Sequence, residues 1–140
     1  MKNAIVTGAS NGIGLEISKK LCENNYYVGM IDIDKENLLK ESENISNSVA
    51  IEGDVTNEDS IKNALDTFNK TPDLIVNNAG IVIFGGLEEQ SIEDFKKSVN
   101  VSLIGSYLVS RLAIDSMIKK GSGCIINMSS INGVHPGPGT

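Results

Sequence analysis

The chain has 140 residues, 40% of them hydrophobic and 21% charged, a composition that suits one soluble globular domain. Its formal net charge of -6 argues against nucleic acid and anionic membranes as partners. The two cysteines, Cys22 and Cys124, lie far apart, so we predict no disulfide framework, no metal site and a cytoplasmic location. A basic leader and a long apolar run are both missing, so we expect neither secretion nor a membrane span.

Apolar strands and amphipathic helices alternate along the sequence. Strand patterns cover 2–7, 26–32, 48–55, 72–80 and 123–130, and helical patterns cover 12–24, 34–45, 56–70 and 91–120, the last as one or two helices. The third helical pattern starts with Thr56 followed three residues later by Asp59, which is typical of a capped N-terminus. Strands that are apolar on both faces predict a doubly wound parallel α/β sheet, a Rossmann fold, in a single domain spanning 1–140.

The stretch GASNGIG lies between the first strand and the first helix. Gly8 allows a tight turn, Gly12 lets backbone N–H groups approach a diphosphate, and Gly14 lets the helix pack closely on the strand. A glycine-rich turn without a ligand is the plainer interpretation. The position of the stretch favours a dinucleotide site, in which Ser10, Asn11 and Ile13 complete the binding loop.

Asp32 ends the second strand, close to the distance after the glycines expected of a carboxylate that binds the adenosine ribose. A carboxylate accepts hydrogen bonds from a ribose 2′-hydroxyl and repels a 2′-phosphate, so we predict NAD in preference to NADP. The alternative is that Asp32 only caps the helix over 34–45.

Further motifs follow in order: TGASNGIG at 7–14, GDV at 53–55, NNAG at 77–80, the asparagine in SVNVSLIG, and GCIINMSS at 123–130. Together they resemble the short-chain dehydrogenase/reductase family over essentially the whole chain. The resemblance implies that Asp54 and Val55 contact adenine and that Asn78, Ala79 and Gly80 line the cofactor groove. It also implies that Ser130 holds the substrate oxygen and that Asn100 disturbs its helix and supports a proton relay through water.

Each of these residues also has a plainer interpretation. Asp54 could support the start of the next helix, and Asn78 could simply end a strand. Asn100 could be an exposed amide, and Ser130 could belong to a turn. A serine hydrolase is disfavoured because the sequence lacks a G-x-S-x-G elbow and its single histidine, His135, lies in a Pro/Gly loop, where we give it no role.

The resemblance also implies an acid/base tyrosine in Tyr-x-x-x-Lys, a little over a dozen residues beyond the serine. Tyr26, Tyr27 and Tyr107 have no lysine four residues later, so this motif is missing from the 140 residues. We therefore expect a sheet cut short after about five strands, and a chain that is inactive on its own and is a fragment of a longer enzyme. The alternative is a natural short protein that binds or senses a dinucleotide without catalysis.

As a member of that family, the parent enzyme would transfer hydride between NAD and a small secondary alcohol or ketone. The long segment 91–120 carries apolar residues on more than one face, including Leu103, Tyr107 and Ile118. In the family this helix lies at a subunit interface, so we expect a homodimer or homotetramer.

Overall fold

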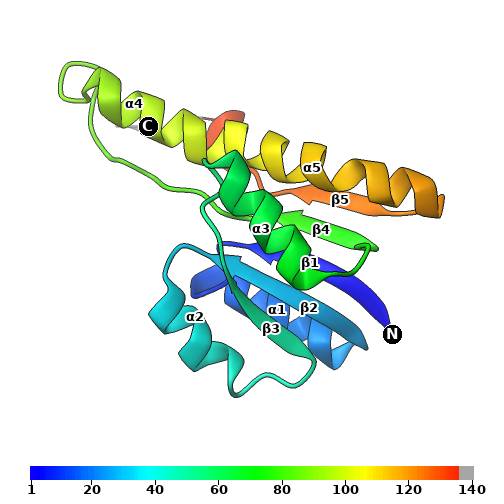
Figure 1. The fold of residues 1–140 in the computed structure, drawn as a ribbon. Coiled ribbons are helices and arrows are strands. Elements are labelled where there is room, and N and C mark those ends of the chain that lie inside the picture. Colours follow the sequence, from blue (N-terminus) through cyan, green and yellow to red (C-terminus); the bar gives the residue numbers. More distant parts are fainter. Residues whose placement is uncertain (136–140) are drawn as a thin grey trace.

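Five parallel strands form one sheet in the order β3-β2-β1-β4-β5 in the computed structural model, which describes residues 1–135 (Figure 1). The strands are β1 (Lys2–Thr7), β2 (Tyr26–Asp32), β3 (Ser48–Glu52), β4 (Leu74–Asn77) and β5 (Cys124–Asn127). The helices are α1 (Gly12–Glu23), α2 (Lys35–Ser42), α3 (Glu58–Phe68), α4 (Ile92–Val99) and α5 (Gly105–Lys120). The predicted doubly wound parallel α/β sheet is thereby confirmed.

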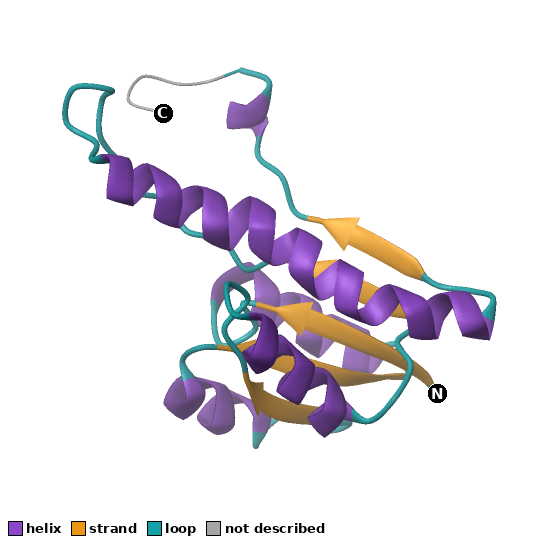
Figure 2. Ribbon diagram, turned by 45° about the horizontal axis from the view of Figure 1, so that its top comes forward, coloured by secondary structure: helices purple, strands orange, loops and turns teal. Residues whose placement is uncertain are grey.

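Helices cover both faces of this sheet (Figure 2). Side chains alternate along β1, so that Ile5 packs beneath α3 and α5 whereas Val6 packs beneath α1 and α2. The first core includes Phe68 and Val109, and the second includes Leu38, all of them buried. Burial on both faces explains why β1 and β2 are continuous apolar runs.

Several predicted boundaries differ from the structure. Strands β3, β4 and β5 are shorter than expected: each ends at a polar residue, Glu52, Asn77 or Asn127, and β4 and β5 also begin later. The capping prediction for α3 was wrong by one residue: Asn57, not Thr56, accepts the hydrogen bond from the Ser60 N–H at 2.9 Å. Strand β5 is largely exposed instead of buried, because no other described strand pairs with its outer edge.

The long segment forms two helices joined by a π-helical turn, Asn100–Ile104. Taken as one helix, Ile92–Lys120 has the length and apolar composition to cross a membrane: its best 18-residue window has a mean hydropathy of 1.3. The sequence analysis expected no segment that could span a membrane, so this finding differs from that expectation. The finding itself rests on the length and composition of the helix alone. In the structure α5 packs on the sheet through Val109, Ala113 and Met117, and 22% of that window is buried.

At the amino ends of the strands, Asp73, which precedes β4, connects neighbouring elements of the fold. Its Oδ2 accepts a hydrogen bond from the Asn3 N–H at 2.8 Å, and its Oδ1 pairs with Lys120 at the end of α5. Lys120 and the Asn3 N–H together hold the pKa of the Asp73 carboxyl below its ordinary value. One carboxylate thus joins β1, β4 and α5.

We predict that Asp73→Ala lowers the free energy of unfolding at pH 7 by about 1–3 kcal/mol, because it removes a charged acceptor from two donors. The folded state favours the ionised carboxyl, so this stabilisation is complete above the pKa of the unfolded chain and is lost as the pH falls through the lowered folded pKa. Urea unfolding should therefore show the difference between wild type and variant shrinking below about pH 4.

The matched control is Asp66→Ala, which removes an exposed carboxylate of α3 that pairs with no cation in residues 1–135. We expect this control to change the free energy of unfolding by less than about 0.5 kcal/mol at either pH. A loss in Asp73→Ala that stays constant from pH 7 to pH 3 would contradict the ion-pair interpretation.

Candidate cofactor-binding site

The direction of chain connections reverses between β1 and β4, which are neighbours in the sheet although α1, β2, α2, β3 and α3 separate them in sequence. Ligands of open α/β sheets bind at such a point, outside the carboxyl ends of the strands. The glycine-rich loop follows β1 at this edge, and NNAG runs from the end of β4 at the same edge. The topology therefore brings the two predicted motifs together.

The glycine-rich loop needs its glycines for two separate reasons. Gly8 and Gly12 have φ values of +66° and +52°, which side-chain-bearing residues rarely adopt. At Gly14 the constraint is space, because a Cβ there would lie 2.1 Å from the Gly8 carbonyl oxygen. Around Gly12, in contrast, a Cβ would meet no atom within 4 Å. Gly14 thus packs α1 against the loop, whereas Gly12 borders open space.

Asn78 supports the loop from the end of β4. Its Nδ2 donates to the carbonyl oxygens of Thr7 and Gly8, at 3.0 and 3.1 Å. In return, the buried Thr7 Oγ1 accepts hydrogen bonds from the N–H groups of Asn78 and Ala79, at 3.1 and 3.0 Å. These reciprocal bonds fix the two motifs to each other, and they leave Gly80 exposed at the rim.

The Asp32 carboxylate faces the same loop and is half-buried. Its Oδ2 accepts a hydrogen bond from the Ser10 N–H at 2.9 Å, and its Oδ1 accepts one from the Asp34 N–H at 3.0 Å. The residue that caps α2 is Asp34, whose Oδ1 accepts from the Asn37 N–H at 3.1 Å. Asp32 therefore lies between the loop and α2 with lone pairs left on both oxygens.

The amino end of α1 differs from those of the next three helices. Asp34, Asn57 and Ser91 cap α2, α3 and α4 with side-chain oxygens, and each of those helices has an acidic residue in its first turn. Helix α1 has neither: its first turn has no acidic residue, and its N-cap residue Asn11 turns its Nδ2 to the Ser10 Oγ at 3.2 Å instead of capping the helix. Ile13, in the first turn, is 63% exposed. An uncapped amino end with free N–H groups beside open space at Gly12 fits the diphosphate of a dinucleotide.

A hollow of about 380 Å³ lies beyond Asp32, between the end of β2 and helix α4. Its lining consists of Ile33, Asp54, Thr56, Glu93, Lys96, Lys97, Asn100 and Val101. Asp54 accepts from both the N–H and the hydroxyl of Thr56, at 2.8 and 2.7 Å, which also supports the turn before α3. The Val55 side chain is buried against Gly105, so it faces the core.

The residues predicted for the reaction lie at the same edge. Asn100 is exposed and begins the π-helical turn, where the regular helix is interrupted. Ser130 is exposed after β5 and caps a short 3-10 helix, with its Oγ accepting from the Asn132 N–H at 3.2 Å. His135 is exposed and ends the described part of the chain. None of the described hydrogen bonds connects Asn100 with Ser130.

Sequence reasoning missed residues that support the site from a distance. Asn37 of α2 bonds to the Ser10 carbonyl. Lys96 and Lys97 border the hollow beside Asp54. The amphipathic pattern of α2 gave no signal for Asn37. The NNAG motif did mark Asn77, which is buried and joins β4 to α5 and β5.

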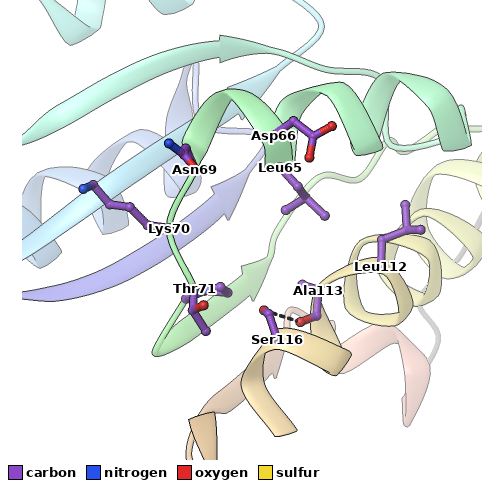
Figure 3. Close-up of a pocket in the computed structure, with 9 residues that line it drawn as sticks. Leu65, Asp66, Asn69, Lys70, Thr71, Leu112, Ala113 and Ser116 are labelled. Atoms are coloured by element: carbon purple, nitrogen blue, oxygen red, sulfur yellow. Dashed lines mark hydrogen bonds between the residues drawn. The ribbon is translucent and has the colours of Figure 1, made fainter. Parts of the chain in front are cut away.

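A second hollow, of about 360 Å³, lies at the opposite, amino edge of the sheet between α3 and α5 (Figure 3). Leu65, Lys70 and Leu112 are among the residues that line it. It contains none of the predicted site residues, and the glycine-rich loop lies at the other end of the strands. We therefore place the candidate site at the carboxyl edge.

Comparison with known proteins identifies the family of the chain. The family model for short chain dehydrogenase matches residues 2–140. The chain belongs to the short chain dehydrogenase family. An uncharacterized oxidoreductase of Thermotoga maritima is 37% identical over 95% of this chain and 55% of its own length.

Other relatives in the short chain dehydrogenase family carry more specific names. A probable NADP-dependent dehydrogenase of Haemophilus influenzae is 33% identical over 98% of this chain and 56% of its own length. An NAD-dependent glycerol dehydrogenase of Listeria innocua is 31% identical over 92% of this chain and 52% of its own length. The chain thus spans about half the length of these relatives, and their names include both nicotinamide cofactors.

We predict that Gly14→Ala lowers the free energy of unfolding by about 3 kcal/mol, at the upper end of the usual cost of overpacking, because α1 must move away from the loop. Gly12→Ala is the matched control. Its Cβ enters open space, so only the strained φ remains, at a cost of about 1 kcal/mol. Urea unfolding of both variants tests this difference, and equal losses would contradict the close-approach argument.

Proposed function

We propose that this chain is the nucleotide-binding part of an NAD-dependent oxidoreductase acting on a secondary alcohol or ketone. The observation that carries the proposal is the uncapped amino end of α1, which lies next to Gly12 and the Asp32 carboxylate. Backbone N–H groups at that end would hold the diphosphate, and Asp32 would accept the ribose hydroxyls. The family match over residues 2–140 and the oxidoreductase relatives favour an enzyme over a sensing module.

Charge supports NAD as the cofactor. A 2′-phosphate would bring negative charge toward the Asp32 carboxylate, and the neighbouring positions Asn11 and Ile33 carry no compensating charge. Lys96 and Lys97 are the cations that line the adjoining hollow, and they lie on its α4 side together with Glu93. The arrangement therefore favours an unsubstituted ribose.

The cofactor, when bound, would supply hydride transfer. Ser130 would donate a hydrogen bond to the reacting oxygen of the substrate, and the interrupted helix at Asn100 would leave polar groups free to hold a water for proton transfer. The 140 residues contain no Tyr-x-x-x-Lys, so we expect no turnover by this chain alone. The exposed apolar side chains of α4 and α5, such as Phe95 and Tyr107, support a homodimer or homotetramer.

The test is calorimetry with NAD and NADP on the wild-type chain and on Asp32→Asn. The variant keeps the size of the side chain but loses its charge, so NAD affinity should fall about 10- to 100-fold and the preference over NADP should narrow. Asp34→Asn is the matched control, because asparagine also caps helices well and the variant keeps the backbone N–H that donates to Asp32. Tighter binding of NADP than NAD by the wild type would overturn the cofactor assignment.

A further inference from the structure

Asn37, on the first turns of α2, reaches back to the glycine-rich loop. Its Nδ2 donates a hydrogen bond to the Ser10 carbonyl oxygen at 2.7 Å, across 27 positions of sequence. Ser10 is 1% exposed, so its backbone groups depend on protein partners instead of water. Asn37 therefore supplies a partner that the loop needs.

This contact closes a ring of four hydrogen bonds. Asp32 Oδ2 accepts from the Ser10 N–H at 2.9 Å, and the Ser10 carbonyl accepts from Asn37. The Asn37 N–H donates to Asp34 Oδ1 at 3.1 Å, and the Asp34 N–H donates to Asp32 Oδ1 at 3.0 Å. Both oxygens of Asp32 are thus held in place by a ring that includes Asn37.

We infer that Asn37 is a positioning residue that sets the preference of this site for NAD over NADP, an inference that rests on the proposed function. It acts through Ser10, whose N–H bonds Asp32 and whose carbonyl accepts from Asn37, so the two contacts hold the peptide groups on either side of one Cα. Without the amide donor, the buried Ser10 carbonyl lacks its partner and the backbone at Ser10 is free to turn. A shift of the Ser10 backbone lengthens the bond from its N–H to Asp32 and loosens the carboxylate that discriminates between the two riboses.

The ring also limits space beside the ribose position. Asn37 ties α2 directly to the loop, so the gap between them cannot widen while the bond is made. A 2′-phosphate is larger than a hydroxyl and needs either a cation or room, and neither Asn11 nor Ile33 supplies a cation here. Loss of the Asn37 side chain should therefore weaken NAD binding more than NADP binding.

The experiment measures NAD and NADP affinity by calorimetry, and stability by urea unfolding, for wild type, Asn37→Ala and Asn37→Gln. We expect Asn37→Ala to weaken NAD binding about tenfold and to reduce the preference over NADP at least about threefold. Asn37→Gln keeps an amide donor and should recover most of both values. All variants retain the backbone N–H that bonds Asp34.

Asn44→Ala is the matched control, since the Nδ2 of Asn44 donates locally to the Lys40 carbonyl at 3.4 Å, away from the loop. It should leave both affinities unchanged. If Asn37→Ala does not fold, Asn37→Asp takes its place: it preserves size but opposes an acceptor to the Ser10 carbonyl, and the same losses are expected.

Two results would overturn the inference while the proposed function stands. One is a variant with lowered stability but wild-type affinities for both nucleotides, which would make the Asn37 bond a structural contact only. The other is an equal loss in Asn37→Ala and Asn37→Gln, which would exclude a requirement for the donor. If the wild-type chain binds neither nucleotide, the proposed function fails and this inference fails with it.

Discussion

The close approach of α1 to the end of β1 is the constraint on which the candidate site depends. Gly14 leaves so little space that a Cβ would lie 2.1 Å from the Gly8 carbonyl, and Asn78 occupies the adjoining space with its Nδ2. The helix can therefore begin directly above the strand end, and its unpaired N–H groups face the edge of the sheet. If α1 began farther away, the same glycines would form only a mobile turn.

Capping chemistry explains why this helix end, and not the others, is available to a ligand. Asp34, Asn57 and Ser91 each use a side-chain oxygen to satisfy the first N–H groups of their helices. Asn11 has a side chain that could do the same, yet its amide turns to Ser10 instead. The sequence alone could not show this, because asparagine at an N-cap normally predicts a closed helix end.

The predictable part of the fold is the part that local pattern controls. Buried parallel strands such as β1 and β2 can be predicted because they are continuous apolar runs. The spacing from Gly14 to Asp32 can be predicted because both residues belong to one βαβ unit. Hydrogen bonds between residues far apart in the sequence cannot be predicted from such patterns. The bond from Asn37 to Ser10 depends on how two separate elements meet in space. The choice between Thr56 and Asn57 as cap is local, and it differs from the prediction because Thr56 bonds back to Asp54 while Asn57 accepts from Ser60.

The two adjacent asparagines of NNAG show how one strand end serves both halves of the site. Asn78 turns to Thr7 and Gly8 and so holds the glycine-rich loop. Asn77 turns to the opposite side, where its Nδ2 donates to Ser110 Oγ at 2.9 Å and to Asn127 Oδ1 at 2.8 Å. It thereby joins β4 to the helix that follows Asn100 and to the strand that precedes Ser130.

This arrangement has an energetic cost, because the Asn77 Oδ1 is buried and finds no partner among residues 1–135. An unpaired buried carbonyl costs about 1–3 kcal/mol, which an apolar side chain at this position would avoid. Three acceptors on the other end of the same amide, Ser106 O, Ser110 Oγ and Asn127 Oδ1, offset that cost. An apolar residue would pack as well but would not fix the positions of α5 and β5 relative to β4. The distance between Asn100, before α5, and Ser130, after β5, depends on those positions.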